Sequence, residues 1–168
     1  DYLLGSGPMI VGHGNPLVQS AVLEQLEKGT TFFATNEKSV ELAEEIVKAV
    51  PCAEKVRFCS TGSEATLYAM RIARAFRGRD KILKFEGGFH GMNDYALMSM
   101  SPTKLLDFPK AEPDSAGIPK SLAQEMLVAP FNNIEVTSTI IQKYRDTIGG
   151  VIVEPFQRLI PPKEGFLQ

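Results

Sequence analysis

Several protein classes are excluded by what this sequence lacks. Two cysteines and no tryptophan occur among 168 residues, too few cysteines for a disulfide framework or, without clustered histidines, for a zinc site. Neither sign of charge dominates, because 18 basic residues oppose 20 acidic ones, so non-specific binding to nucleic acid or anionic lipid is not expected. No apolar run reaches the length of a transmembrane helix. We therefore expect neither a nucleic-acid nor a membrane partner, and the cysteine content fits a reducing compartment, the cytoplasm.

The composition that remains is that of a globular chain, with 43% hydrophobic and 23% charged residues, which excludes disorder of the whole. The chain starts at Asp1 without an initiator methionine and stops at Gln168 without a terminal signature, so we expect a piece of a longer protein. Local signals predict a helical segment over residues 1–52. Asn15 can cap a first helix, and apolar residues recur at three- and four-residue steps through a second one over residues 40–50.

Residues 53–168 alternate strand and helix patterns, which predicts an α/β fold with a mostly parallel sheet. The first strand, helix and strand form a unit whose crossover of about twenty residues allows parallel pairing. Four prolines make residues 101–120 an irregular excursion. The last strand is apolar on both faces, which is typical of a buried parallel strand. The expected elements are, in order, a strand at residues 56–59, a helix at 64–76, strands at 81–85, 95–100 and 126–128, a helix after Asn133 and a strand at 151–153.

The segment STGSEA, residues 60–65, separates a predicted strand from a predicted helix. Thr61 and Glu64 have the spacing of a capping box, which places Gly62 and Ser63 in the first helical turn with backbone N–H groups that point outward. Glycine lets an anion approach the backbone, the serine adds a hydroxyl donor, and the helix dipole favours negative charge. The segment can therefore hold a phosphate. A well-capped helix start without a ligand is the alternative.

A second segment, FEGGFHG at residues 85–91, also follows a predicted strand. Its glycines allow a tight turn at the carboxyl edge of the sheet, where ligands of open α/β folds bind. Phe89 can stack on a planar ligand or pack in the core, and the sequence leaves both interpretations open. His90 alone is a weak indication of a site.

Glu154 is the third candidate, because it ends an apolar strand at the same edge of the sheet. A carboxylate in such a place needs an ionic or hydrogen-bonding partner. It belongs either to the site or to the structural support of a neighbouring loop.

These segments, STGSEA, FEGGFHG and VIVEP in this order, resemble the class III pyridoxal-phosphate aminotransferases. The resemblance extends over nearly the whole chain, through GHGNPLV, EKVRFCSTGSEAT, RIARAFRGRDKILKFEGGFHG, LVAPFNNIE and PPKEGFL. Within the class, the sequence is most similar to the glutamate-1-semialdehyde 2,1-aminomutase group. The resemblance implies an incomplete fold-type I large domain, an α/β/α sandwich, over residues 53–168.

The resemblance also implies a cofactor, pyridoxal 5'-phosphate, and a role for each segment. Thr61, Gly62 and Ser63 would hold the cofactor phosphate. Phe89 would stack on the pyridine ring, and His90 would support that site. The substrate would be a small amino acid or amino aldehyde, and a homodimer is expected.

Glu154 would lie near the ring nitrogen without binding the cofactor directly. The Schiff-base lysine of the family, and the aspartate that pairs with the ring nitrogen, are expected beyond Gln168. The catalytic residues are therefore unknown from these 168 residues, which we do not expect to catalyse a reaction alone.

One departure from the aminomutase pattern leaves other functions open. Where the aminomutases have a small, glycine-containing segment after Glu-Pro, this chain has FQRLI at residues 156–160. Bulkier side chains there would alter a substrate pocket, so a transaminase of β- or ω-amino acids and 2-oxo acids is an alternative. A non-catalytic α/β module for assembly or anion binding is a second alternative.

Overall fold

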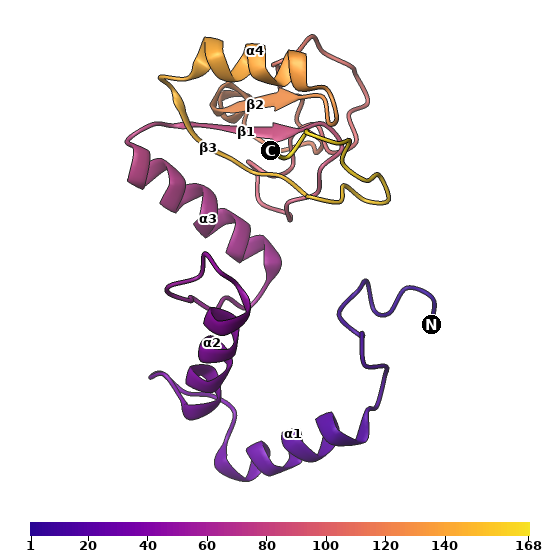
Figure 1. The fold of residues 1–168 in the computed structure, drawn as a ribbon, viewed down its shortest axis with the longest axis vertical. Helices are drawn as coiled ribbons and strands as arrows, with labels where there is room; N and C mark the ends of the chain where they lie inside the picture. The colour runs from indigo at the N-terminus through magenta and orange to yellow at the C-terminus, as the bar shows by residue number, and fades with distance from the viewer. The chain divides into compact units, whose positions relative to one another are not determined.

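The computed structural model describes residues 1–168, and the chain divides into two compact units, Asp1–Arg57 and Phe58–Gln168 (Figure 1). The expected division into domains at residues 52 and 53 stays a prediction. None of the helices combines the length and the hydropathy that a bilayer crossing requires.

The first unit contains two capped helices, α1 (Pro16–Lys28) and α2 (Glu37–Ala49). The side chain of Asn15 accepts hydrogen bonds from the first turn of α1, and the side chain of Asn36 accepts one from the Ser39 amide at 3.0 Å. The first helix was expected from its Asn15 cap and the second from its apolar spacing, whereas the Asn36 cap was not foreseen. No residue in this unit is buried, so its helices depend on these local signals.

The second unit is built on a three-stranded parallel sheet with the order β2-β1-β3. Its strands are β1 (Lys81–Phe85), β2 (Met126–Ala129) and β3 (Ile148–Val151), and its helices are α3 (Gly62–Arg77), the short 3-10 helix η1 (Lys120–Glu125) and α4 (Ile134–Tyr144). Figure 1 shows α3 and α4 on opposite sides of the strands. The predicted α/β sandwich with a parallel sheet is confirmed.

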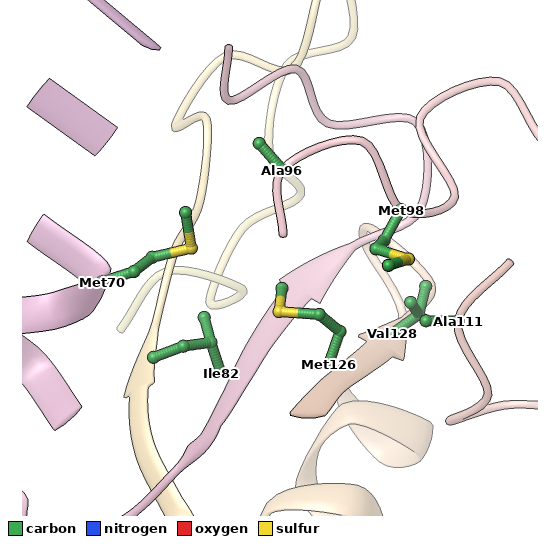
Figure 2. Packing of buried hydrophobic residues seen from close by; sticks show 7 residues of the cluster. All are labelled: Met70, Ile82, Ala96, Met98, Ala111, Met126 and Val128. Atoms are coloured by element: carbon green, nitrogen blue, oxygen red, sulfur yellow. The ribbon is translucent and has the colours of Figure 1, made fainter. Parts of the chain in front are cut away.

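Two hydrophobic clusters lie on the two faces of this sheet, because successive side chains of a strand point to opposite faces. On the α3 face, Met70 packs with Ile82, and Figure 2 shows the other side chains of that cluster around them. On the α4 face, Ile140 packs with Leu83 and Phe85. The helices are thus fixed by the residues that the strands present to them.

Helix α3 and the residues that follow it approach β3 closely because two glycines leave room for them. A Cβ at Gly149 would stand 2.5 Å from the Arg79 carbonyl oxygen, and one at Gly150 would stand 2.9 Å from Ala73 Cβ. Both contacts are too short for any side chain. This close packing fixes the orientation of α3 on the sheet. The N-terminus of α3 therefore belongs to a helix that is packed against the core.

Three strand predictions need correction. Residues 56–59 form no strand, so the predicted strand-helix-strand unit is wrong and β1 pairs with β2 and β3 instead. Residues 95–100 contain only an isolated bridge at Met98. The backbone of Leu97 and Ser99 bonds to residues 112 and 114, but this pairing is not extended into a strand, and the carbonyls of Ala96 and Met98 accept from the Lys84 side chain. The last strand, predicted at residues 151–153, instead spans Ile148–Val151.

Candidate functional site

The N-terminus of α3 has the predicted capping geometry. The Thr61 hydroxyl accepts from the Glu64 amide at 3.2 Å, and the Glu64 carboxylate accepts from the Ser60 amide at 2.8 Å. The amides of Gly62 and Ser63 belong to the first turn and have no carbonyl within the helix to bind. A Cβ placed on Gly62 would meet nothing within 4 Å. An anion can therefore reach these two amides.

The loop at residues 86–91 packs directly on this helix start. Ser63 Oγ accepts from the Met92 amide at 2.9 Å, which leaves the hydroxyl proton of Ser63 available for another acceptor. Thr66 Oγ1 donates to the His90 carbonyl at 2.6 Å. Gly91 has a φ of 90°, and a Cβ there would stand 2.7 Å from Ser63 Cα. The structure thus brings the STGSEA and FEGGFHG segments into contact.

Phe89 lies at the surface of this loop, with 47% of its area exposed. The interpretation of Phe89 as a core residue is therefore wrong, and about half of its surface is accessible. Its amide donates to Glu154 Oε2 at 3.0 Å. Glu154 accordingly has the loop-supporting role that was one of its two interpretations. Its predicted place near a cofactor ring nitrogen stays a prediction.

His90 is buried next to Phe89, with 6% of its area exposed. Burial lowers the pKa of its imidazole to about 4, and the charge of Lys84 contributes in the same direction. The imidazole is therefore neutral at neutral pH.

Lys84 is a buried charged residue close to the site that was not expected from the sequence. It is fully buried in β1, where its ammonium donates to the carbonyls of Ala96, at 2.9 Å, and of Met98. Burial lowers the pKa of Lys84 to about 8, against the attraction of Asp114 and Glu154. A lysine between the apolar residues Leu83 and Phe85, in the interior of a strand, was the signal that could have identified it.

Two side chains of the FQRLI segment bind the same loop. Gln157, with 5% of its area exposed, donates through Nε2 to the Glu86 carbonyl at 2.8 Å. Arg158 Nε donates to the Gly87 carbonyl at 3.0 Å. The sequence marked this segment as unusual but did not indicate these contacts, because they join residues 71 positions apart.

The site thus combines four features: a helix start that is open to an anion, a half-exposed aromatic residue, a neutral imidazole and a carboxylate. The carboxylate, that of Glu154, accepts from the backbone amide of the aromatic residue Phe89. The class-III aminotransferase family model matches residues 1–168. The chain belongs to the class III aminotransferases. Pyridoxal phosphate is the cofactor of this family.

Curated relatives of this class III aminotransferase chain include two archaeal proteins named glutamate-1-semialdehyde 2,1-aminomutase. The one from Methanothermobacter thermautotrophicus is 44% identical, and the one from Thermoplasma volcanium is 45% identical. Each match covers 100% of this chain and 40% of the relative. The chain therefore spans about two fifths of the length of these relatives.

The solved structures that resemble this chain include both transaminases and aminomutases by name. An omega-transaminase from Sphaerobacter thermophilus is 36% identical with a TM-score of 0.95, over 100% of this chain and 40% of that one. A transaminase with bound pyridoxal phosphate is 28% identical with a TM-score of 0.90, over 98% of this chain and 39% of that one. A glutamate-1-semialdehyde aminomutase from Pseudomonas aeruginosa, 23% identical with a TM-score of 0.79 over 99% of this chain and 36% of that one, shares the fold.

The residues of this class III aminotransferase chain fit the chemistry of pyridoxal phosphate. A phosphate dianion suits the free amides of Gly62 and Ser63, where the absent Cβ leaves the approach open. A flat heterocycle suits the exposed face of Phe89. These two features lie on segments that are in contact through Ser63 and Met92.

Proposed function

We propose that this chain forms the phosphate- and ring-binding half of a pyridoxal-phosphate site, and that the protein transfers amino groups as the glutamate-1-semialdehyde 2,1-aminomutases do. The observation that carries the proposal is the contact between the Ser63 hydroxyl and the Met92 amide. It joins the anion-binding helix start to the loop of Phe89 and His90. The 44% identity to a named aminomutase supports the choice of reaction.

In this proposal each residue has a binding or orienting role. The amides of Gly62 and Ser63, with the Ser63 hydroxyl, donate to the phosphate, and the Phe89 ring lies against the heterocycle. Glu154 keeps Phe89 in place through its amide. Bound pyridoxal phosphate supplies an electron sink for the bonds at the substrate's reacting carbon. His90 supports the loop as a neutral side chain, so it adds no positive charge.

Thr61 has a supporting part in this arrangement. Its hydroxyl is engaged by the Glu64 amide, and we infer that it shapes the phosphate site through the helix cap. The lysine and aspartate that the family resemblance implies are expected outside residues 1–168. Proton transfer to and from the substrate is assigned to that lysine and to none of the residues described.

A transaminase of β- or ω-amino acids is the second candidate function. The binding of Gln157 and Arg158 to the loop favours it, because these residues replace the small segment of the aminomutases. The omega-transaminase match and a β-phenylalanine aminotransferase from Variovorax paradoxus, 31% identical with a TM-score of 0.74, support it too. An aminomutase converts its substrate without an external amino acceptor, whereas a transaminase requires a 2-oxo acid. Product analysis with and without added 2-oxo acid separates the two.

Cofactor titration of the intact protein tests the proposed site. Ser63→Ala and Phe89→Ala should each raise the dissociation constant of pyridoxal phosphate by roughly 5- to 10-fold, since one hydrogen bond or one ring contact contributes about 1 kcal/mol. The double variant should lose more than either single one. Ser115→Ala, at an exposed serine outside the site, is the matched control. Unchanged affinity in the double variant would contradict the assignment.

We also propose that the protein is a homodimer that acts in the cytoplasm. Helices α1 and α2 bury no residue, and apolar side chains such as Leu17, Val22 and Leu42 are more than half exposed. A second copy of the protein would cover such side chains. Both cysteines are free, as in a reducing compartment. Sedimentation of the intact protein at several concentrations tests the dimer, and a monomer throughout would refute it.

A further inference from the structure

Two buried polar atoms near the candidate site have no hydrogen-bond partner. They are His90 Nε2 and Gln157 Oε1, on side chains that are 6% and 5% exposed. Buried polar atoms are nearly always paired, because an unpaired one keeps the full cost of leaving water. Each of the two atoms therefore needs a partner.

The two atoms lie beside the same residue, Gly88. A Cβ on Gly88 would stand 3.1 Å from His90 Nε2 and 3.4 Å from Gln157 Oε1. Since glycine has no Cβ, the space between the two side chains stays open. A small side-chain rotation or a single water molecule can join them.

The donor and acceptor characters of the two atoms are complementary. Gln157 Nε2 lies 2.8 Å from the Glu86 carbonyl oxygen, and a carbonyl oxygen can only accept, so the amide orientation is fixed. Gln157 Oε1 is therefore an acceptor without a donor. The imidazole of His90 is neutral and carries one N–H, which can reside on Nε2. A proton on Nε2 supplies the donor that Gln157 lacks.

We propose that Gln157 is a positioning residue for His90: its Oε1 accepts from the Nε2–H of His90, directly or through one water that donates to Oε1. This bond fixes the Nε2-protonated tautomer of His90 and leaves Nδ1 as an acceptor. It also joins the FQRLI segment to the Phe89–His90 loop at a further point besides the Glu86 and Gly87 carbonyls. The side chain that departs from the aminomutase pattern thus sets the state of the imidazole beside Phe89.

Nitrogen-15 NMR of the histidine rings in the intact protein measures the tautomer directly. Residues 1–168 contain two histidines, and the His90→Gln variant identifies the signal of His90 by its loss. The proposal predicts that neutral His90 is protonated predominantly at Nε2. Protonation predominantly at Nδ1 in the unmodified protein would overturn the proposal without the use of any Gln157 variant.

Substitutions at position 157 test the assigned partner. Gln157→Met removes the acceptor and should shift His90 toward a mixture of the two tautomers. Gln157→Glu places a carboxylate beside Nε2 and should raise the pKa of His90 by about one unit or more. Arg158→Gln, which removes a contact of the neighbouring residue with the same loop, should leave the His90 tautomer unchanged. If both Gln157 variants retain the His90 tautomer and pKa of the unmodified protein, the proposal is wrong.

Discussion

The two units of the chain are stabilised by different means. No residue is buried in Asp1–Arg57, whereas Leu83, Val128 and Ala129 of Phe58–Gln168 have no exposed surface. The helices of the first unit are stabilised by caps and exposed side-chain pairs. The helices and strands of the second unit are stabilised by the burial of side chains at the sheet. The whole candidate site lies in the second unit, where packing fixes the geometry that a ligand requires. Substitutions of similar chemistry should therefore have different consequences in the two units.

The largest effect is expected from Gly91→Ala, in the contact between the loop and α3. The positive φ of this residue disfavours a side chain, and its Cβ would stand 2.7 Å from Ser63 Cα. Strain and overpacking together should lower the free energy of unfolding by about 3 kcal/mol and weaken cofactor binding by roughly 10-fold or more. Denaturant unfolding and cofactor titration measure the two losses.

Gly117→Ala is the matched control, because Gly117 has a φ of 94° but no atom within 4 Å of its Cβ position. It should lose only about 1 kcal/mol of unfolding free energy and keep its cofactor affinity. Equal losses in the two variants would show that the contact between Gly91 and Ser63 has no energetic importance.

A smaller effect with a distinctive pH dependence is expected from Lys84→Met. Burial lowers the pKa of Lys84 to about 8 from the model-peptide value of 10.5, so the unfolded chain binds more protons than the folded one between these two pH values. The stability that Lys84 contributes should therefore rise from pH 8 to about 10.5, by roughly 2–3 kcal/mol relative to the variant. Unfolding free energies of both proteins across this range measure the difference.

Lys48→Met, on the exposed surface of α2, is the matched variant in the first unit for Lys84→Met in the second. Lys48 forms an exposed pair with Glu45, and its loss should change the free energy of unfolding by less than about 0.5 kcal/mol at neutral pH. A flat difference between the unmodified protein and Lys84→Met from pH 8 to 10.5 would contradict the burial of the ammonium.

The smallest effects are expected at two matched helix caps. Asn36 Oδ1 accepts from the Ser39 amide at 3.0 Å in the first unit, and Asn133 Oδ1 accepts from the Val136 amide at 3.1 Å in the second. Each change to alanine should cost about 1 kcal/mol of helix stability. Asn133→Ala should lower the global unfolding free energy, because α4 packs on the sheet. Asn36→Ala should mainly accelerate amide exchange within α2, and a global loss as large as that of Asn133→Ala would break the comparison.

Most of the correct predictions came from signals between residues that are close in the sequence. The caps at Asn15, Thr61 and Asn133 mark helix starts because the cap and its helix are neighbours in sequence. The strands at residues 81–85 and 126–128 were expected from short local runs rich in apolar residues. The encounter of STGSEA with FEGGFHG was expected from placing both after strands at one edge of the sheet, although only the strand before FEGGFHG forms.

The predictions that failed depended on partners distant in the sequence. Residues 56–59 and 95–100 have strand-like patterns, but a strand also needs a neighbour with free backbone groups. At residues 95–100, two carbonyls are bound by the side chain of Lys84, and the backbone pairing with residues 112–114 amounts to one isolated bridge. The contacts of Gln157 with Glu86 span 71 positions, and no local pattern encodes such a pairing.

The most direct test of the central claim is a crystal structure of the intact protein with pyridoxal phosphate. The account predicts the phosphate at the amides of Gly62 and Ser63, with the pyridine ring against the face of Phe89. A phosphate bound elsewhere, or a ring that does not touch Phe89 while the phosphate is at α3, would contradict the account.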